Sequence, residues 1–126
     1  GRVDIVISNS SDKPIYEQIA SQIKALILSG ELVEGEQLPS IRALANGLRV
    51  SVITTKRAYA DLEAAGLIET VRGKGCFVAG GNAELIREEH LRAVEALMEQ
   101  AVNEGRALGL SDEELLEMLS TMMESE

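Results

Sequence analysis

The sequence of 126 residues has little of what several classes of protein require. Aromatic residues make up 2% of the chain and tryptophan is absent, so a core has to be built from aliphatic side chains and methionine. The single cysteine, Cys76, excludes a disulfide within the chain and favours a reducing cytoplasm as its location. No apolar run approaches the roughly 18 residues of a membrane span, and the N-terminal residues lack the apolar segment of a signal peptide.

Residues for catalysis or metal binding are equally sparse. The sequence shows no nucleophile paired with a base, no glycine-rich phosphate loop of the P-loop type and no paired carboxylates typical of a cleft. The one histidine, His90, has no second histidine or cysteine near it, so a solvated side chain is favoured over a metal ligand. Cys76 is interpreted as a small core residue, with a redox-sensitive thiol as the alternative. We therefore expect no enzyme, no cofactor and no metal site.

Acidic residues are unevenly distributed along the chain, whose net charge is −9. Residues 1–80 contain nine basic and nine acidic residues, whereas residues 81–126 contain three basic and twelve acidic residues. Between Arg42 and Lys74 the basic residues outnumber the acidic ones by six to three. Because local charge indicates which partners a surface attracts, the pattern predicts a weakly basic N-terminal domain joined to an acidic C-terminal one.

Apolar periodicity and capping residues predict three helices in the N-terminal part. Isoleucines recur at helical spacing over residues 14–29, and Gly30 is placed to end that helix. Ser40 and Ser51 are good N-caps for two further helices, over residues 41–47 and 52–65. The short connection between these two helices is typical of a helix-turn-helix. Upstream, the β-branched residues Val3 to Ile7 are a candidate strand.

A hairpin and a two-helix tail complete the predicted order. Residues 67–71 and 76–79 are strand-like, and Gly73 and Gly75 between them permit the positive φ of a tight turn. Helix, helix-turn-helix and hairpin follow one another as in a winged helix. After a predicted hinge at residues 80–82, we expect a long helix over residues 83–108 and a last helix over residues 112–124, which a Ser111–Glu114 capping box begins.

The last helix is apolar on most sides, and such a helix needs burial on most sides. The long helix can cover only one of them, so we expect a second copy of the chain to cover the rest. The alternative is that the tail folds back on its own N-terminal domain. The residues predicted at the dimer interface are Leu91, Val94, Met98, Leu115, Leu116, Leu119, Met122 and Met123.

The helix over residues 52–65 combines a core face with a face suited to DNA. Thr55, Tyr59 and Leu62 share one stripe, which we expect to be buried. The opposite face presents Val52, Ile53, Lys56, Arg57 and Ala60, with Thr54 at its border. Such a helix fits the major groove of DNA. There a lysine can donate to guanine, a threonine hydroxyl can donate to or accept from a base edge, and an apolar side chain can contact a thymine methyl.

An isolated Lys–Arg pair is usually just a solvated helix face. Here further groups lie at the expected DNA-facing places: Ser40 and Arg42 at the preceding helix, and Arg72 and Lys74 at the hairpin tip. This combination favours DNA binding.

The stretch LPSIRALANGLRVSVITTKRAYADLEAAGLIETVRGKGCFV, Leu38 to Val78, resembles the DNA-binding part of the GntR family of bacterial transcription regulators. Residues 14–40 are similar to the sequence pattern with which the DNA-binding part of that family begins. Only 46 residues follow Gly80, which is too few for the large effector or aminotransferase-like domains of other subgroups. The short two-helix tail resembles the YtrA-like subgroup.

The resemblance implies roles for matching positions. Arg42 would contact DNA, Ser51 would cap its helix and donate to a phosphate, and Thr54 and Lys56 would meet bases or phosphates. Gly73 would approach the minor groove, with Arg72 and Lys74 on either side.

Two positions depart from the family pattern. Val52 stands where many members have arginine, which removes a possible guanine contact. Arg49 stands where many have glycine, and it either adds a phosphate contact or only replaces a permissive turn residue.

Together these observations predict a mainly α protein with a small β-hairpin. Residues 1–80 form a winged helix-turn-helix domain and residues 81–126 a two-helix dimerisation tail. The predicted function is that of a cytoplasmic homodimeric repressor on a palindromic operator. A small-molecule effector is an option, and it would bind at the dimer interface or in the crevice between the N-terminal domain and the tail, around Gly80–Gly81. The alternative function is a winged-helix protein–protein interaction module with little DNA specificity.

Overall fold

The computed structural model describes residues 3–125, which form helices and one two-stranded antiparallel sheet. In chain order the elements are α1 (Ile15–Leu28), α2 (Ile41–Leu48), α3 (Val52–Ala64), β1 (Ile68–Val71), β2 (Gly75–Val78), α4 (Asn82–Ala107) and α5 (Asp112–Glu124). The chain divides into two compact units, one ending at Arg87 and one beginning at Glu88. We call them the head unit and the tail unit; the start of α4 belongs to the head unit.

The helices of the head unit begin where the sequence predicts. Ser40 caps α2, because its hydroxyl accepts from the Ala43 N–H at 3.0 Å. Ser51 caps α3 in the same way, accepting from the Thr54 N–H at 3.0 Å. Pro14 precedes α1, and Gly30 follows its end with a φ of +88° that suits glycine. These signals act over three or four residues, so the sequence alone contains them.

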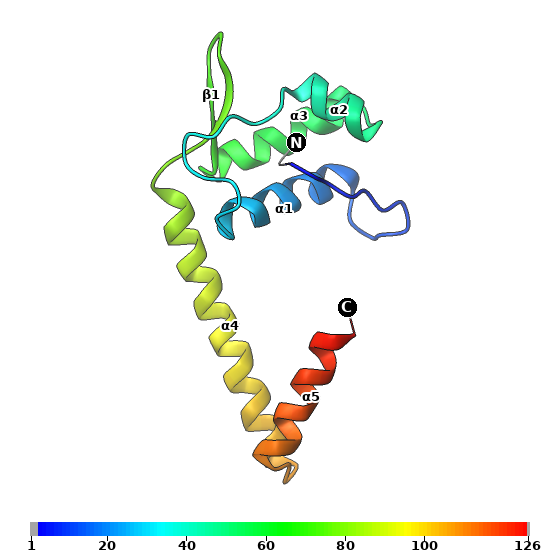
Figure 1. The fold of residues 1–126 in the computed structure, drawn as a ribbon, viewed down its shortest axis with the longest axis vertical. Coiled ribbons are helices and arrows are strands. Elements are labelled where there is room, and N and C mark those ends of the chain that lie inside the picture. Colours follow the sequence, from blue (N-terminus) through cyan, green and yellow to red (C-terminus); the bar gives the residue numbers. More distant parts are fainter. Residues whose placement is uncertain (1–2, 126) are drawn as a thin grey trace. The chain divides into compact units, whose positions relative to one another are not determined.

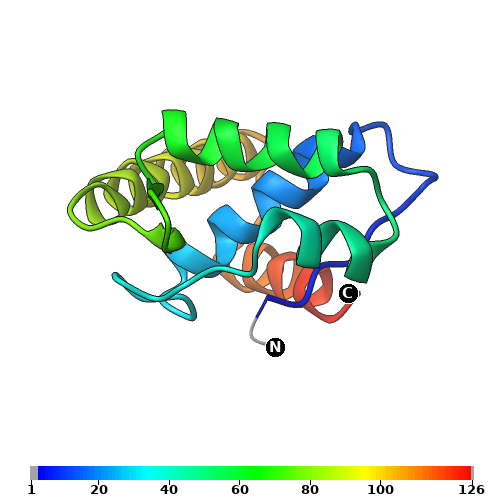
Figure 2. The same ribbon diagram turned by 90° about the horizontal axis from the view of Figure 1, so that it is seen from above.

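The core of the head unit lies where α1 and α2 both pack against α3. Figures 1 and 2 show these three helices gathered together, with the β1–β2 hairpin projecting from the end of α3. Each fully buried aliphatic side chain stabilises the fold by about 1.5–3 kcal/mol. The buried cluster consists of Ile19, Ile23, Ile27, Leu32, Leu38, Leu44, Ala58, Tyr59, Leu62, Leu67, Ile68 and Val78.

The predicted strand at residues 3–7 is wrong. Within residues 3–125 this segment forms no β-ladder; the side-chain amides of α1 take the place of a partner strand. Gln22 accepts from the Val6 N–H at 2.9 Å and donates to the Val6 carbonyl at 2.8 Å. Gln18 accepts from the Ser8 N–H and donates to the Ser8 carbonyl, at 2.8 and 2.9 Å. The backbone groups of Val6 and Ser8 are thus satisfied without a sheet.

The tail unit contains most of α4 and all of α5. The predicted capping box is present: the Ser111 hydroxyl accepts from the Glu114 N–H, and Glu114 accepts from the Ser111 N–H. These bonds lower the pKa of the Glu114 carboxyl. Near the connection the helices lie so close that a Cβ on Gly105 would meet the Leu115 side chain. None of the helices in residues 3–125 has the length and apolar character to cross a membrane.

Candidate nucleic-acid interface

The faces of α3 divide as the sequence predicts. Thr55, Ala58, Tyr59 and Leu62 are buried in the head unit. The opposite face is open to solvent: Ile53 is 81% exposed, and Val52, Lys56, Arg57 and Ala60 are also exposed, with Thr54 half-buried at the border. An apolar side chain as exposed as Ile53 at the start of a capped helix is available to a partner, and a thymine methyl is one that it fits.

Two hydroxyl groups at the start of α3 are linked by a short hydrogen bond. The Ser51 hydroxyl donates to Thr54 Oγ1 at 2.7 Å and also accepts from the Thr54 N–H. Thr55 is turned inward, where its hydroxyl donates to the Ser51 carbonyl at 3.2 Å. With the Ser51 hydroxyl directed at Thr54 Oγ1, the Thr54 hydroxyl hydrogen is the one directed at no protein acceptor in this network. The resemblance implied a phosphate contact for Ser51 and a base or phosphate contact for Thr54, and both roles stay predictions.

Tyr59 connects α3 with the segment that leads into α2. Its phenol donates to the Pro39 carbonyl at 2.7 Å, one residue before the cap Ser40. Burial raises the pKa of the Tyr59 phenol far above its usual value, and the nearby Cys76 adds to the rise. The phenol therefore stays protonated and keeps its donor role. This bond holds the start of α2, with the exposed Arg42, against the helix that carries Lys56.

Arg49 is the C-cap of α2 and has a left-handed backbone with φ of 59°. It is the one non-glycine residue with positive φ in the part of the chain that the structure describes. Left-handed backbone costs about 1–2 kcal/mol for a residue with a side chain. The position thus suits glycine, as the family pattern suggests, yet it carries an exposed guanidinium beside the turn into α3.

Arg57 lies over the ring of Tyr16 in α1, with 3.7 Å between its guanidinium carbon and the ring centroid. This cation–π contact joins α1 to the exposed side of α3 and restricts the rotamers of Arg57. Sequence reasoning missed Tyr16, because nothing in the spacing of two residues 41 positions apart indicates that they meet. Arg57 differs in this respect from Lys56, which lies over no aromatic ring among the described residues.

The hairpin carries its basic residues at the tip. β1 and β2 pair from Ile68 with Val78 to Val71 with Gly75, which leaves Arg72, Gly73 and Lys74 as the connection. Gly73 has φ of +78°, so the turn needs this residue. Within residues 3–125, neither tip cation forms an ion pair with a carboxylate, and the same holds for Arg42 and Lys56. Four exposed, unpaired cations on three elements of one unit form a surface suited to phosphates.

The predicted interface residues of the tail are mostly exposed to solvent in the single chain. Among them, Leu91, Val94, Met98, Leu116, Met122 and Met123 are between 48% and 66% exposed. Leu119 is 38% exposed, and Leu115 is half-buried against Gly105 within the chain. Gly105 is the only buried residue in the described parts of α4 and α5.

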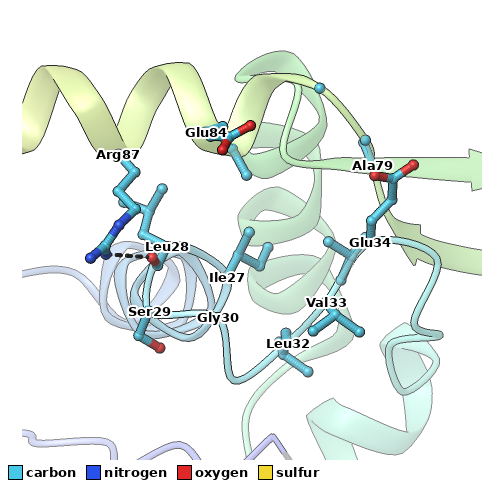
Figure 3. A pocket seen from close by; sticks show the side chains of 14 residues that line it. Ile27, Leu28, Ser29, Gly30, Leu32, Val33, Glu34, Ala79, Glu84 and Arg87 are labelled. Atoms are coloured by element: carbon cyan, nitrogen blue, oxygen red, sulfur yellow. Dashed lines mark hydrogen bonds between the residues drawn. The ribbon is translucent and has the colours of Figure 1, made fainter.

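A surface pocket lies in the head unit at the start of α4 (Figure 3). Its apolar wall includes Ile27 and Leu32, and Glu34 and Glu84 stand at its rim. Arg87 also lines it and donates to the Leu28 carbonyl at 2.9 Å, which fixes the first turns of α4 to the end of α1. Gly80 and Gly81 line this pocket, but all of its lining residues belong to the head unit, so it is not the predicted crevice between the N-terminal domain and the tail.

Comparison with known proteins connects this surface with a family. Residues 15–78 match the family described as bacterial regulatory proteins, gntR family. YhcF of Bacillus subtilis, an uncharacterized HTH-type transcriptional regulator, is 40% identical over 90% of this chain and 93% of its own length. The HTH-type transcriptional repressor YtrA of the same organism is 34% identical, covering 91% of this chain and 88% of YtrA.

Solved structures agree with these relatives. A GntR family transcriptional regulator from Listeria monocytogenes is similar with a TM-score of 0.66 and 34% identity, over 91% of this chain and 98% of that chain. AraR(DBD) in complex with operator ORX1 is similar with a TM-score of 0.55 and 28% identity, over 61% of this chain and 96% of that chain. The winged helix described above is therefore found in a protein solved on its operator.

Proposed function

Because this chain belongs to the GntR family of bacterial transcription regulators, and resembles its member YtrA, we propose that it is a homodimeric repressor that binds a palindromic operator. The observation that carries this proposal is the exposed, unpaired basic surface around the capped start of α3. Lys56 is exposed and Thr54 half-buried on α3, and both would meet base edges in the major groove. Arg42, with Arg72 and Lys74 of the hairpin, would neutralise backbone phosphates.

The bare tail supports the dimer. Six of the eight predicted interface residues are about half exposed or more in the single chain. A folded chain rarely leaves so large a set of apolar side chains uncovered in water, because each one buried contributes about 1.5–3 kcal/mol. A second copy offers the same apolar face and therefore fits a two-fold contact. Two copies would present two α3 helices to half-sites about one helical turn of DNA apart.

Selection from a random duplex library tests this function. The purified full chain should enrich a palindrome with half-sites one turn apart, and its affinity should fall steeply with salt, by about 0.9 logarithmic units per phosphate contact for each logarithmic unit of salt.

Lys56→Ala should weaken binding to the winning site by about 1–3 kcal/mol, the value of a base contact. Arg42→Ala should weaken binding similarly on all sequences and lower the salt slope by about one.

Lys24→Ala is the matched control, since it removes a lysine from α1 in the same unit without touching the proposed surface. It should bind like the parent. If Lys56→Ala and Arg42→Ala both bind like the parent, the surface is misplaced. If no sequence is enriched and binding is weak and governed by salt alone, the head unit serves as a protein–protein module instead.

A small molecule that controls repression would have a place in the pocket at the start of α4, whose rim carries Glu34 and Glu84. Such a ligand has to bind the operator-competent and incompetent states with different affinity. Effector control therefore predicts that a ligand which shifts operator affinity is blocked by a Val33→Trp change at the pocket wall, while the ligand-free affinity stays at the parent value, since Val33 is 56% exposed.

A further inference from the structure

The segment before α2 lies against the hairpin as an additional, irregular strand. The Leu38 N–H donates to the Cys76 carbonyl at 2.9 Å, and the Val78 N–H donates to the Glu36 carbonyl at 2.9 Å. Gln37 and Phe77 form an antiparallel bridge at this point. The backbone that leads into Ser40 and Arg42 is therefore tied to the strand that leads back from the hairpin tip.

Every second carbonyl along one edge of β2 accepts a hydrogen bond from the segment before α2. The Val78 carbonyl accepts from the Gly35 N–H and the Cys76 carbonyl accepts from the Leu38 N–H, both at 2.9 Å. Since every second residue of a strand points to the same edge, the next acceptor toward the tip is the Lys74 carbonyl. The partner backbone has by then turned away into the cap of α2, so it supplies no donor there.

The side chain of Gln37 fills this position. Its Nε2 donates to the Lys74 carbonyl at 3.0 Å, across 37 residues of sequence. Gly75 makes room for the amide: its φ is +118°, and a Cβ there would lie 2.9 Å from Gln37 Nε2. Gln37 thus extends the ladder by one step, to the last residue of the basic tip.

We propose that Gln37 is a positioning residue for the hairpin, holding Arg72 and Lys74 at the angle at which they reach DNA alongside the start of α2. The inference rests on the proposed DNA contact of the hairpin. A two-stranded hairpin is marginally stable alone. Fixing its last carbonyl to the segment that carries Ser40 and Arg42 reduces the freedom that binding would otherwise have to remove.

Gln37→Met tests the proposal, because methionine has a similar length and no donor. The operator affinity of this variant should fall about 3- to 10-fold, and its salt slope should fall toward that of the Arg72→Ala/Lys74→Ala variant. Added to Arg72→Ala/Lys74→Ala, Gln37→Met should have no further effect, because the cations it positions are gone. Amide hydrogen exchange in residues 72–75 of the free protein should become faster.

Gln22→Met is the matched control, since it removes two amide–backbone bonds elsewhere in the head unit. It should keep the parent's affinity and salt slope. Parent-like affinity of Gln37→Met, or an equal loss in the Arg72→Ala/Lys74→Ala background, would overturn the positioning role while leaving the repressor function standing. If the parent enriches no operator, the proposed function itself fails and the inference falls with it.

Discussion

The head unit buries its apolar side chains, whereas the tail unit leaves most of its own in solvent. In the head unit, α1, α2 and α3 enclose a cluster that includes Ile19 and Ile23, both 0% exposed. In the tail unit, α5 has no buried residue among those described, and Leu116 and Met123 are 66% and 65% exposed. Both units are rich in aliphatic residues, so the difference lies in how many faces the fold can cover. Three packed helices can bury the apolar side chains of one another, whereas each helix of a two-helix hairpin has a partner on one side only.

The largest effect is expected from charging the tail with Leu116→Asp/Met122→Asp. If these side chains are buried between two copies, the unpaired carboxylates should weaken the free energy of dimerisation by several kcal/mol, because burying a charge without a partner is costly. The variant should sediment as a monomer at micromolar concentration where the parent sediments as a dimer. Val33→Asp, at a position 56% exposed in the head unit, is the matched control and should leave the mass unchanged. Equal masses for parent and variant would exclude the tail as the dimer interface.

A smaller effect is expected from truncating the core of the head unit. Ile23→Ala should lower the free energy of unfolding by about 2–5 kcal/mol, since it leaves a cavity at a fully buried site. Val6→Ala, at a position 76% exposed in the same unit, should change the free energy of unfolding by less than about 0.5 kcal/mol. Chemical denaturation measures both. Similar values for the two variants would contradict the contrast in burial.

The bond between Tyr59 and Pro39 predicts a smaller, pH-dependent effect. Tyr59→Phe should cost about 0.5–1.5 kcal/mol at neutral pH, because the Pro39 carbonyl loses its donor. The pKa of Tyr59 is raised in the folded state, so its contribution is complete below the unfolded pKa of about 10 and is lost as pH rises above it. Unfolding measured between pH 8 and 10.5 should therefore show a steeper decline for the parent. Parallel curves would show that Tyr59 ionises equally in both states.

The smallest change in stability is expected at Arg49. Arg49→Gly relieves a left-handed backbone but adds freedom to the unfolded chain, so the net gain should be below about 1 kcal/mol. Operator affinity should nevertheless fall, with a salt slope lower by about 0.9 for each phosphate that Arg49 neutralises in the parent. Arg49→Asn, which tolerates this backbone without charge, should show the same change in slope. An unchanged slope in both would mean that Arg49 only fills the turn.

Local signals were predictable because their partners are close in sequence. The caps Ser40, Ser51 and Ser111 act on N–H groups three residues away, and the isoleucines of α1 mark its buried face by their spacing. The strand at residues 3–7 was predicted wrongly, since composition identifies an extended segment but not its partner. That partner is a pair of glutamine side chains in α1, 10 and 16 residues along the chain.

The sequence by itself determined the order of helices and hairpin, the buried and exposed faces of α3, and the family to which the chain belongs. Only the tertiary structure decided that Tyr16 lies under Arg57, that Tyr59 donates to the Pro39 carbonyl, and that Gln37 donates to the Lys74 carbonyl at the hairpin tip. Periodicity and capping act within one or two turns of a helix and leave a pattern in the sequence. A hydrogen bond between residues 37 positions apart leaves no such pattern, because it depends on how the whole chain closes around its core.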